Sequence, residues 1–352
     1  MIIRLPSPPA ALADRVLGEH LSHLRECRGE QLDIVADRLP ARSGLTPDDL
    51  AAAEAGLSTV LPFAAVAGQG LALARAYGAG QFAADDWQEC TEGIRRWAVA
   101  GFSEGFCDFA PGWAHRYQIL EERASNVLIA AGGQILPAPL LTDRLEEVAW
   151  RCRPGAHPRR PREGARLGEL KGPGCALCQV YCGDLLTDGV GIAAWQREVR
   201  RARTRAFAAR IRTPDGPGTT VLLDEGVLHR RTGGEQLHAE QMGHLACLAE
   251  TTSLRIRVVP MSSGMPVLAE RVQLGTGGDA LTAGLSDWDA HYADGPDPQL
   301  ADWAEHGLGE AASLDLLRQA ASGELGPPWP PEPQSKAEVP PPGTTPAEGI
   351  RR

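Results

Sequence analysis

The chain has 352 residues, of which 43% are hydrophobic and 23% are charged, and its formal net charge is −10. This balance belongs to a globular protein with room for two domains, and it excludes a largely disordered chain. The negative charge argues against indiscriminate binding to nucleic acid or anionic membrane, because both require positive potential. Since no apolar run is long enough to span a bilayer and the N-terminus lacks a signal-peptide pattern, we expect a cytoplasmic protein with no membrane partner.

The first 82 residues predict a compact helical head. Apolar side chains recur at helical spacing in three short segments, and each segment ends at or near a glycine or proline. Thr46 offers an N-cap to the third helix, with Pro47 at its first helical position. The predicted helices are residues 14–28, 31–39 and 46–56, with one or two more over residues 57–77.

The remainder predicts an α+β fold, in which a mostly helical middle is followed by a small C-terminal α/β domain with a short sheet. The order strand, helix, strand over residues 219–260 is the βαβ signature of a parallel or mixed sheet. Asp224 and Glu225 lie where a strand ends and a helix begins, and we interpret them as helix-capping carboxylates. The predicted helices are residues 85–100, 116–131, 195–211, 225–231, 235–250 and 301–322, and the predicted strands are 219–223, 254–260 and 271–274.

These segments define three regions. Residues 1–82 form the head, and residues 83–322 form a second domain with a basic, cysteine-containing insertion at about 151–195. Residues 323–352 are so rich in proline that we expect a disordered tail. Between residues 150 and 212 there are 14 Arg and Lys against 5 Asp and Glu, which indicates either a solvated helix face or a surface for anions or nucleic acid.

The head resembles a known family of helix-turn-helix proteins. The segment LGEHLSHLRECRGEQLDIVADRL is similar to the opening of the Cro/repressor-type motif, with Ala36 as the small residue at the helix–helix contact. The segment GLTPDDLAAAEAG is similar to the recognition helix and to the Glu-x-Gly that closes it, here Glu54 and Gly56. The resemblance places Thr46, Pro47, Asp48 and Asp49 at the groove-facing end of that helix.

The second half of the chain carries the more specific part of the resemblance. The similar segments are QILEERASNVLIAAGGQILPAPLLTD, VLLDEGVLHRRTGGEQLHAEQMGHLACLAETTSLRIRVVPMSSG and LGEAASLDLLRQAA, so that the likeness covers roughly residues 14–322. The family comprises transcriptional regulators common in Streptomyces and related actinobacteria, whose C-terminal domain is described as antitoxin-like. It implies a dimeric DNA-binding regulator, with a C-terminal domain that senses a ligand or partner and has no established catalysis.

The chain departs from that family in ways that affect DNA binding. Residues 40–45 lengthen the loop before the third helix, and the turn LPAPLLT has an altered middle. The candidate recognition helix presents Asp48, Asp49 and alanines where base and phosphate contacts call for cations or amides. From residue 14 to residue 58 five arginines face nine acidic residues. DNA therefore remains a candidate partner that the acidic helix disfavours, beside a protein partner or a second copy of the chain.

Three cysteines, Cys175, Cys178 and Cys182, form a C-x2-C-x3-C cluster flanked by glycines. Thiolates at this spacing could bind zinc or an iron–sulfur cluster, with Cys152 or His157 as a fourth ligand. A second C-x-x-C pair is missing, so free or redox-active thiols and plain buried cysteines stay open as alternatives. The resemblance does not supply this cluster, because it lies in the insertion.

One further motif concerns catalysis. Residues 101–105 fit the G-x-S-x-G pattern around Ser103, but the preceding IRRWAVA indicates a helix end rather than the buried strand that a nucleophile elbow needs. We therefore assign no catalytic residue, and the sequence supports a binding protein more than an enzyme. The first functional hypothesis is a DNA-binding transcriptional regulator, and the alternatives are a relative that binds protein instead of DNA and a metal- or redox-binding protein.

Overall fold

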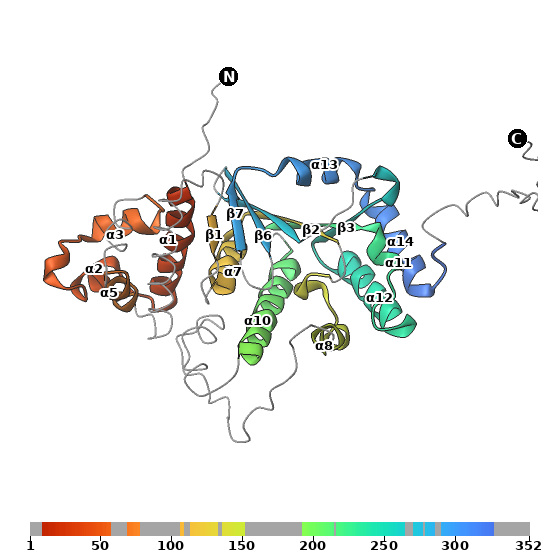
Figure 1. Cartoon of the computed structure of the whole chain (residues 1–352), viewed down its shortest axis with the longest axis horizontal. Helices are drawn as coiled ribbons and strands as arrows, with labels where there is room; N and C mark the ends of the chain where they lie inside the picture. Colours follow the sequence, from red (N-terminus) through yellow and green to blue (C-terminus); the bar gives the residue numbers. More distant parts are fainter. Residues whose placement is uncertain are drawn as a thin grey trace, which may run out of the picture.

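The computed structural model describes residues 9–57, 69–77, 106–108, 113–132, 136–151, 192–214, 216–264, 270–276, 279–285 and 290–326 (Figure 1). A helical N-terminal part lies beside a body built on a mixed β-sheet, so the predicted α+β class is confirmed. The predicted helix 85–100, most of the insertion and the tail beyond residue 326 lie outside these ranges. Within them, no helix is long and apolar enough to cross a bilayer.

Seven strands form one sheet in the order β1-β7-β6-β5-β2-β3-β4. The three strands β2, β3 and β4 are parallel, and every other neighbouring pair is antiparallel. The sheet is larger than the sequence indicates, because β1, β2, β6 and β7 carry no clear alternating pattern. The strands are β1 Phe106–Asp108, β2 Asn126–Ala131, β3 Gly218–Asp224, β4 Leu254–Val259, β5 Arg271–Thr276, β6 Asp279–Leu285 and β7 Ala290–Asp294.

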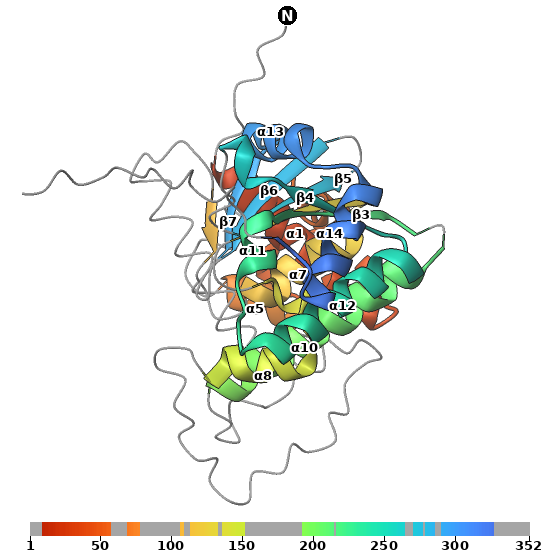
Figure 2. The ribbon, with the colours of Figure 1, turned by 90° about the vertical axis from the view of Figure 1, so that its right-hand side faces the viewer.

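Strand β2 shows how the two faces of the sheet are filled. Val127, Ile129 and Ala131 belong to the main core, whereas Leu128 and Ala130 belong to a second cluster on the opposite face. Helix α13 (Pro298–His306) covers that second face with Leu300 and Trp303. Figures 1 and 2 show α13 above the sheet and α7, α10, α12 and α14 below it.

The prediction of one helix over residues 116–131 is wrong. Helix α7 (Trp113–Arg123) ends there, and the chain continues directly into β2. The apolar run NVLIAA is buried on both faces and pairs with β3 on one side and β5 on the other, and this pairing overrides its helical spacing. The other body helices are η2 Ala138–Leu140, α8 Asp143–Arg151, α10 Ile192–Arg212, α11 Glu225–His229, α12 Glu235–Thr251, η3 Met261–Ser263 and α14 Glu310–Ser322.

The predicted terminal helical segment 301–322 is divided into two helices, α13 and α14. The linker between them runs along the free edge of β4 and forms hydrogen bonds with it. The backbone N–H of Leu308 donates to the Val258 carbonyl at 2.8 Å, and the Val258 N–H donates to the Ser313 hydroxyl at 2.9 Å. The Arg257 side chain donates to the carbonyls of Gly307 and Leu308. These bonds satisfy backbone groups that an edge strand otherwise leaves exposed to pairing with another chain.

The head consists of α1 (Pro9–Cys27), α2 (Leu32–Asp37), η1 (Ala41–Ser43), α3 (Pro47–Glu54) and α5 (Gln69–Ala76). The first three predicted helices are confirmed to within a few residues, and η1 lies in the long loop before α3. Leucines of α1 share a buried core with Val35 of α2, Leu50 of α3 and Leu73 of α5. The opposite side of α1 packs on α7 and β1, so this helix lies between the head and the sheet (Figure 1).

Candidate functional site: the outer surface of α2 and α3

The first turn of α3 contains all four residues that the resemblance marks as groove-facing. Thr46 is the N-cap, and its hydroxyl accepts from the Asp49 backbone N–H at 3.2 Å. The Asp49 carboxylate accepts from the Thr46 backbone N–H at 2.8 Å and from its hydroxyl at 2.7 Å, which completes a capping box. These bonds lower the pKa of the Asp49 carboxyl. Pro47 and Asp48 are exposed beside them.

Two of these four side chains, Thr46 and Asp49, form hydrogen bonds within the helix start itself. The polar atoms of Thr46 and Asp49 bond each other, so they stabilise the start of α3 instead of pointing to a ligand. The next turns of α3 expose Ala51 and Ala55, which carry no hydrogen-bonding side chain. Reading base edges requires donors or acceptors at such positions.

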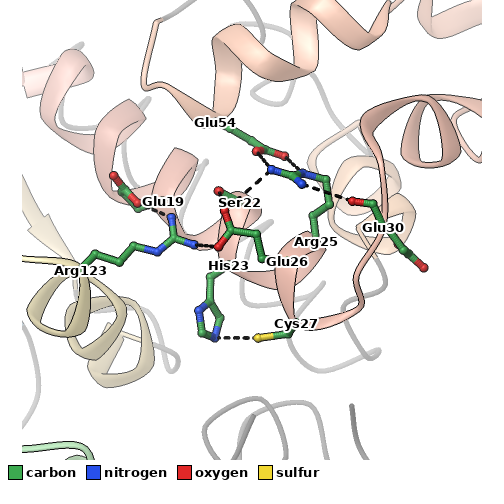
Figure 3. A network of polar contacts seen from close by, with 9 residues as sticks. All are labelled: Glu19, Ser22, His23, Arg25, Glu26, Cys27, Glu30, Glu54 and Arg123. Atoms are coloured by element: carbon green, nitrogen blue, oxygen red, sulfur yellow. Dashed lines mark hydrogen bonds and ion pairs between the residues drawn. The ribbon is translucent and has the colours of Figure 1, made fainter. Parts of the chain in front are cut away.

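An ion pair holds the other end of α3 against α1. The Arg25 guanidinium donates to both carboxylate oxygens of Glu54, at 2.8 and 2.7 Å, and also to the Glu30 carbonyl at 3.2 Å (Figure 3). The Glu54 side chain is only 9% exposed, and Tyr77 lies beside it, with its pKa raised by burial and by Glu54. The pair fixes the orientation of α3 and uses up a cation that could otherwise contact phosphate.

Close backbone packing supports the same contact. A Cβ added at Gly18 of α1 would lie 2.4 Å from the Ala53 carbonyl oxygen and 2.8 Å from that of Glu54. Gly56, just after α3, has φ +71° and approaches the Arg15 backbone similarly closely. These two glycines let the C-terminal end of α3 lie directly on α1.

Two further arginines, Arg28 after α1 and Arg38 after α2, are also paired. Arg38 donates to both Glu30 carboxylate oxygens at 2.8 and 2.6 Å, and its hydrogen bonds lower the pKa of that carboxyl. Arg28 lies 3.5 Å from the same carboxylate. The charges of Arg28 and Arg38 are therefore neutralised locally by Glu30.

We give the name α2–α3 face to a set of exposed residues on and just after α2 and α3. Its carboxylates, Asp33, Asp37 and Asp48, take part in no ion pair among the residues that the structure describes. Its apolar side chains include Ile34 at 45% and Leu57 at 61% exposure, two of the three large hydrophobic side chains exposed in the described ranges. The residues to which we give this name are Asp33, Ile34, Asp37, Asp48, Ala51, Ala55 and Leu57.

Polar contacts join the head firmly to the body. Arg123 of α7 donates to Glu19 at 2.5 Å and to Glu26 at 2.7 Å, so that one guanidinium bridges two turns of α1 (Figure 3). The His115 ring meets the rings of His20 and His23 edge-on, with centroids 5.3 and 5.8 Å apart. Burial, followed by neighbouring positive groups, lowers the pKa of His20 and of His115 well below the usual value.

A fully buried ion pair lies next to that junction. Arg116 of α7 donates to both carboxylate oxygens of Asp108 on β1, each at 2.7 Å, and neither side chain is exposed. Sequence reasoning does not find this pair or the histidine contact, because the partners come from different elements and only packing brings them together.

In the body, hydrogen bonds explain two sequence features. Asp224 caps α11 as predicted, since its carboxylate accepts from the Gly226 N–H at 2.7 Å. The turn LPAPLLT is anchored by Gln241, a fully buried side chain of α12. The Gln241 amide accepts from the Thr142 N–H at 2.8 Å and donates to the Leu140 carbonyl at 2.7 Å. The first interaction stabilises the start of α11 and the second holds the LPAPLLT turn on α12, so we assign neither to catalysis.

The predicted cysteine ligands Cys152, Cys175, Cys178 and Cys182 lie outside the described residues, as do His157 and Ser103. Zinc or iron–sulfur binding by that cluster stays a prediction. Among the residues that are described, no group of three or more His, Cys, Asp and Glu side chains is arranged to hold a metal ion.

The comparisons bear on the body and not on the head. A family described as a domain of unknown function (DUF5753) matches residues 177–285, which is less than a third of the chain. The matched part runs through α10, β3, α12 and β4 and ends with β6. It overlaps the segment that carries the most specific part of the resemblance. No curated protein and no solved structure matches the chain.

Proposed function

We propose that this chain is a regulatory protein of the helix-turn-helix type whose head acts by contact with a protein at the α2–α3 face. The observation that carries the proposal is the chemistry of that face. It includes the carboxylates Asp33, Asp37 and Asp48 together with exposed apolar side chains, while nearby Arg25 and Arg38 are held in bidentate ion pairs.

Electrostatics disfavours DNA as the partner of this face. Duplex DNA carries one negative charge per about 1.7 Å of its axis, and affinity arises largely when cations replace its counterions. Asp33, Asp37 and Asp48 would instead bring further negative charge to the phosphates. Protein interfaces, by contrast, combine apolar and polar side chains, and the exposed residues here include Ile34 and Leu57 as well as the three carboxylates.

The second candidate is the DNA-binding transcriptional regulator that the family resemblance implies. One observation favours it: α3 packs on both α1 and α2, and the N-terminus of α3 is exposed at Thr46 and Pro47. A helix N-terminus attracts phosphate. In either case the proposed role of the α/β body is the antitoxin-like one of sensing a ligand or partner.

Fluorescence anisotropy of labelled duplex DNA from upstream of the protein's own gene tests the choice. At about 150 mM salt we expect no binding that exceeds binding to a shuffled duplex. Specific binding that weakens steeply with salt, and that Thr46→Ala or Arg25→Met abolishes, would overturn protein contact as the function of the head.

A further inference from the structure

A second charged surface of the chain lies on α10. Arg201, Arg205 and Arg212 are exposed, and their spacing of four and seven residues places them on one side of the helix. We call this set the α10 arginine stripe. Within the described ranges, Arg205 and Arg212 lie in no ion pair.

Other arginines of the same helix are used inside the body. Arg203 donates to Glu121 and Glu270 and lies over the Tyr117 ring, 5.0 Å from its centroid. Arg210 donates to the Thr219 hydroxyl and to the Glu121 and Ala124 carbonyls. These bonds fix α10 on the body, so the stripe is a rigid, outward-facing row of positive charge.

Exposed arginines on other elements of the body have local carboxylates instead. Arg144 pairs with Glu240, Arg231 with Glu235, and Arg318 with Glu250. The stripe is thus distinguished from ordinary surface arginines, since Arg205 and Arg212 keep charge that a partner can neutralise.

We propose that the α2–α3 face docks on the α10 arginine stripe of a second copy of this chain, in a two-fold symmetric dimer. Asp33, Asp37 and Asp48 on one surface then face the stripe on the other, where Arg205 and Arg212 lie in no ion pair within the described ranges. The inference rests on the proposed function, because it names the protein that the head contacts.

Geometry requires that the contact be made between two chains. Figure 1 shows α2 and α3 on the far side of α1 from α10, and α1 is joined to α7 through Arg123. The two surfaces of one chain therefore cannot meet without separating the head from the body. Two-fold symmetry makes the contact twice, which matters because a stable interface needs about 1,200–2,000 Å² and a single helix contact is smaller.

The test is the mass of the full-length protein in solution, measured by light scattering or sedimentation from about 1 to about 50 μM at low and high salt. We expect dimers at about 50 mM NaCl and at least tenfold weaker association at about 300 mM, since salt screens exposed charges. A chain that stays monomeric at about 50 μM and low salt would overturn the proposal.

A charge exchange makes the test specific to these surfaces. One variant carries Asp33→Arg, Asp37→Arg and Asp48→Arg, and the other carries Arg201→Glu, Arg205→Glu and Arg212→Glu. Each variant alone should be monomeric, because equal charges then face each other. An equimolar mixture should form a heterodimer, because both of its contacts again join opposite charges.

Asp302→Arg with Glu305→Arg on exposed positions of α13 is the control, and it should remain dimeric. Dimers of either reversed variant alone, or a mixture that stays monomeric while circular dichroism shows both variants folded, would refute the docking. So would a stripe variant that loses binding to duplex DNA but keeps the dimer, since the stripe would then be a nucleic-acid surface. The DNA anisotropy test is independent of these outcomes, so a monomer that binds no DNA refutes only the dimer and leaves protein contact standing.

Discussion

The buried pair of Arg116 and Asp108 allows a quantitative prediction. Asp108→Asn keeps the size of the side chain but removes the negative charge that faces the guanidinium from two oxygens at 2.7 Å. Breaking a fully buried pair on one side costs about 3–5 kcal/mol, because the remaining charge stays desolvated. With a urea m-value of about 2 kcal/mol/M, the unfolding midpoint should fall by about 2 M.

The matched control is the pair of Arg144 and Glu240, which has the same 2.7 Å separation but side chains 64% and 36% exposed. Arg144→Met should cost less than about 1 kcal/mol. In a double-mutant cycle, Asp108→Asn with Arg116→Met should cost less than the sum of the single changes, by about 2 kcal/mol or more. Equal losses for Asp108→Asn and Arg144→Met, or strict additivity at the buried pair, would refute the reasoning.

Three further predictions concern stability and are measured by urea unfolding. Because the pKa values of His20 and His115 are lowered in the folded state, the unfolded state binds more protons below about pH 6.5. The free energy of unfolding should therefore fall below that pH, by up to about 1.4 kcal/mol per pH unit for each histidine. A variant with both histidines changed to Gln that keeps the full pH dependence would contradict this. Gly18→Ala should lower the free energy of unfolding by about 1–3 kcal/mol, because the added Cβ clashes with α3. The control Gly243→Ala, whose Cβ would lie 3.9 Å from its nearest neighbour, should raise it by about 0.5–1 kcal/mol. A gain in stability at both positions would exclude the close approach of α1 and α3. Gln241→Met leaves two backbone groups of the LPAPLLT turn unpaired and should cost about 2–4 kcal/mol, and a neutral result would mean that the turn is held by other contacts.

Local signals in the sequence predict several elements well. The alternation in LRIRVV predicts β4, and the cap residues around Thr46 predict α3, because each pattern reports interactions between residues close together in the chain. The two carboxylates of that turn, Asp48 and Asp49, already indicate an acidic surface by their position at a helix start. What the sequence does not show is that Asp49 is consumed by the cap and Asp48 is exposed.

Other features depend on distant partners and could not be predicted. Strand β2 follows α7 without a strong break, and only pairing with β3 and β5 makes it a strand. The ion pair of Asp108 could not be predicted either, because only packing brings Arg116 of α7 to it. The need for glycine at position 18 likewise depends on how closely α3 approaches α1. The seven strands of the sheet come from residues 106 to 294, far apart in the chain. Local periodicity therefore predicts fewer strands than the sheet contains.

Helix α1 makes contacts in two directions, since its leucines pack in the head while His20 and Glu19 contact α7 on the opposite side. Deleting the head would therefore uncover the flank of the body, and the remaining fragment would lose stability together with any function of the head. Mutation can meanwhile exchange the exposed residues Asp48, Ala51 and Ala55 without changing a buried side chain. A chain built in this way keeps the fold of its head under selection for folding, whatever chemistry the outward residues of α3 present.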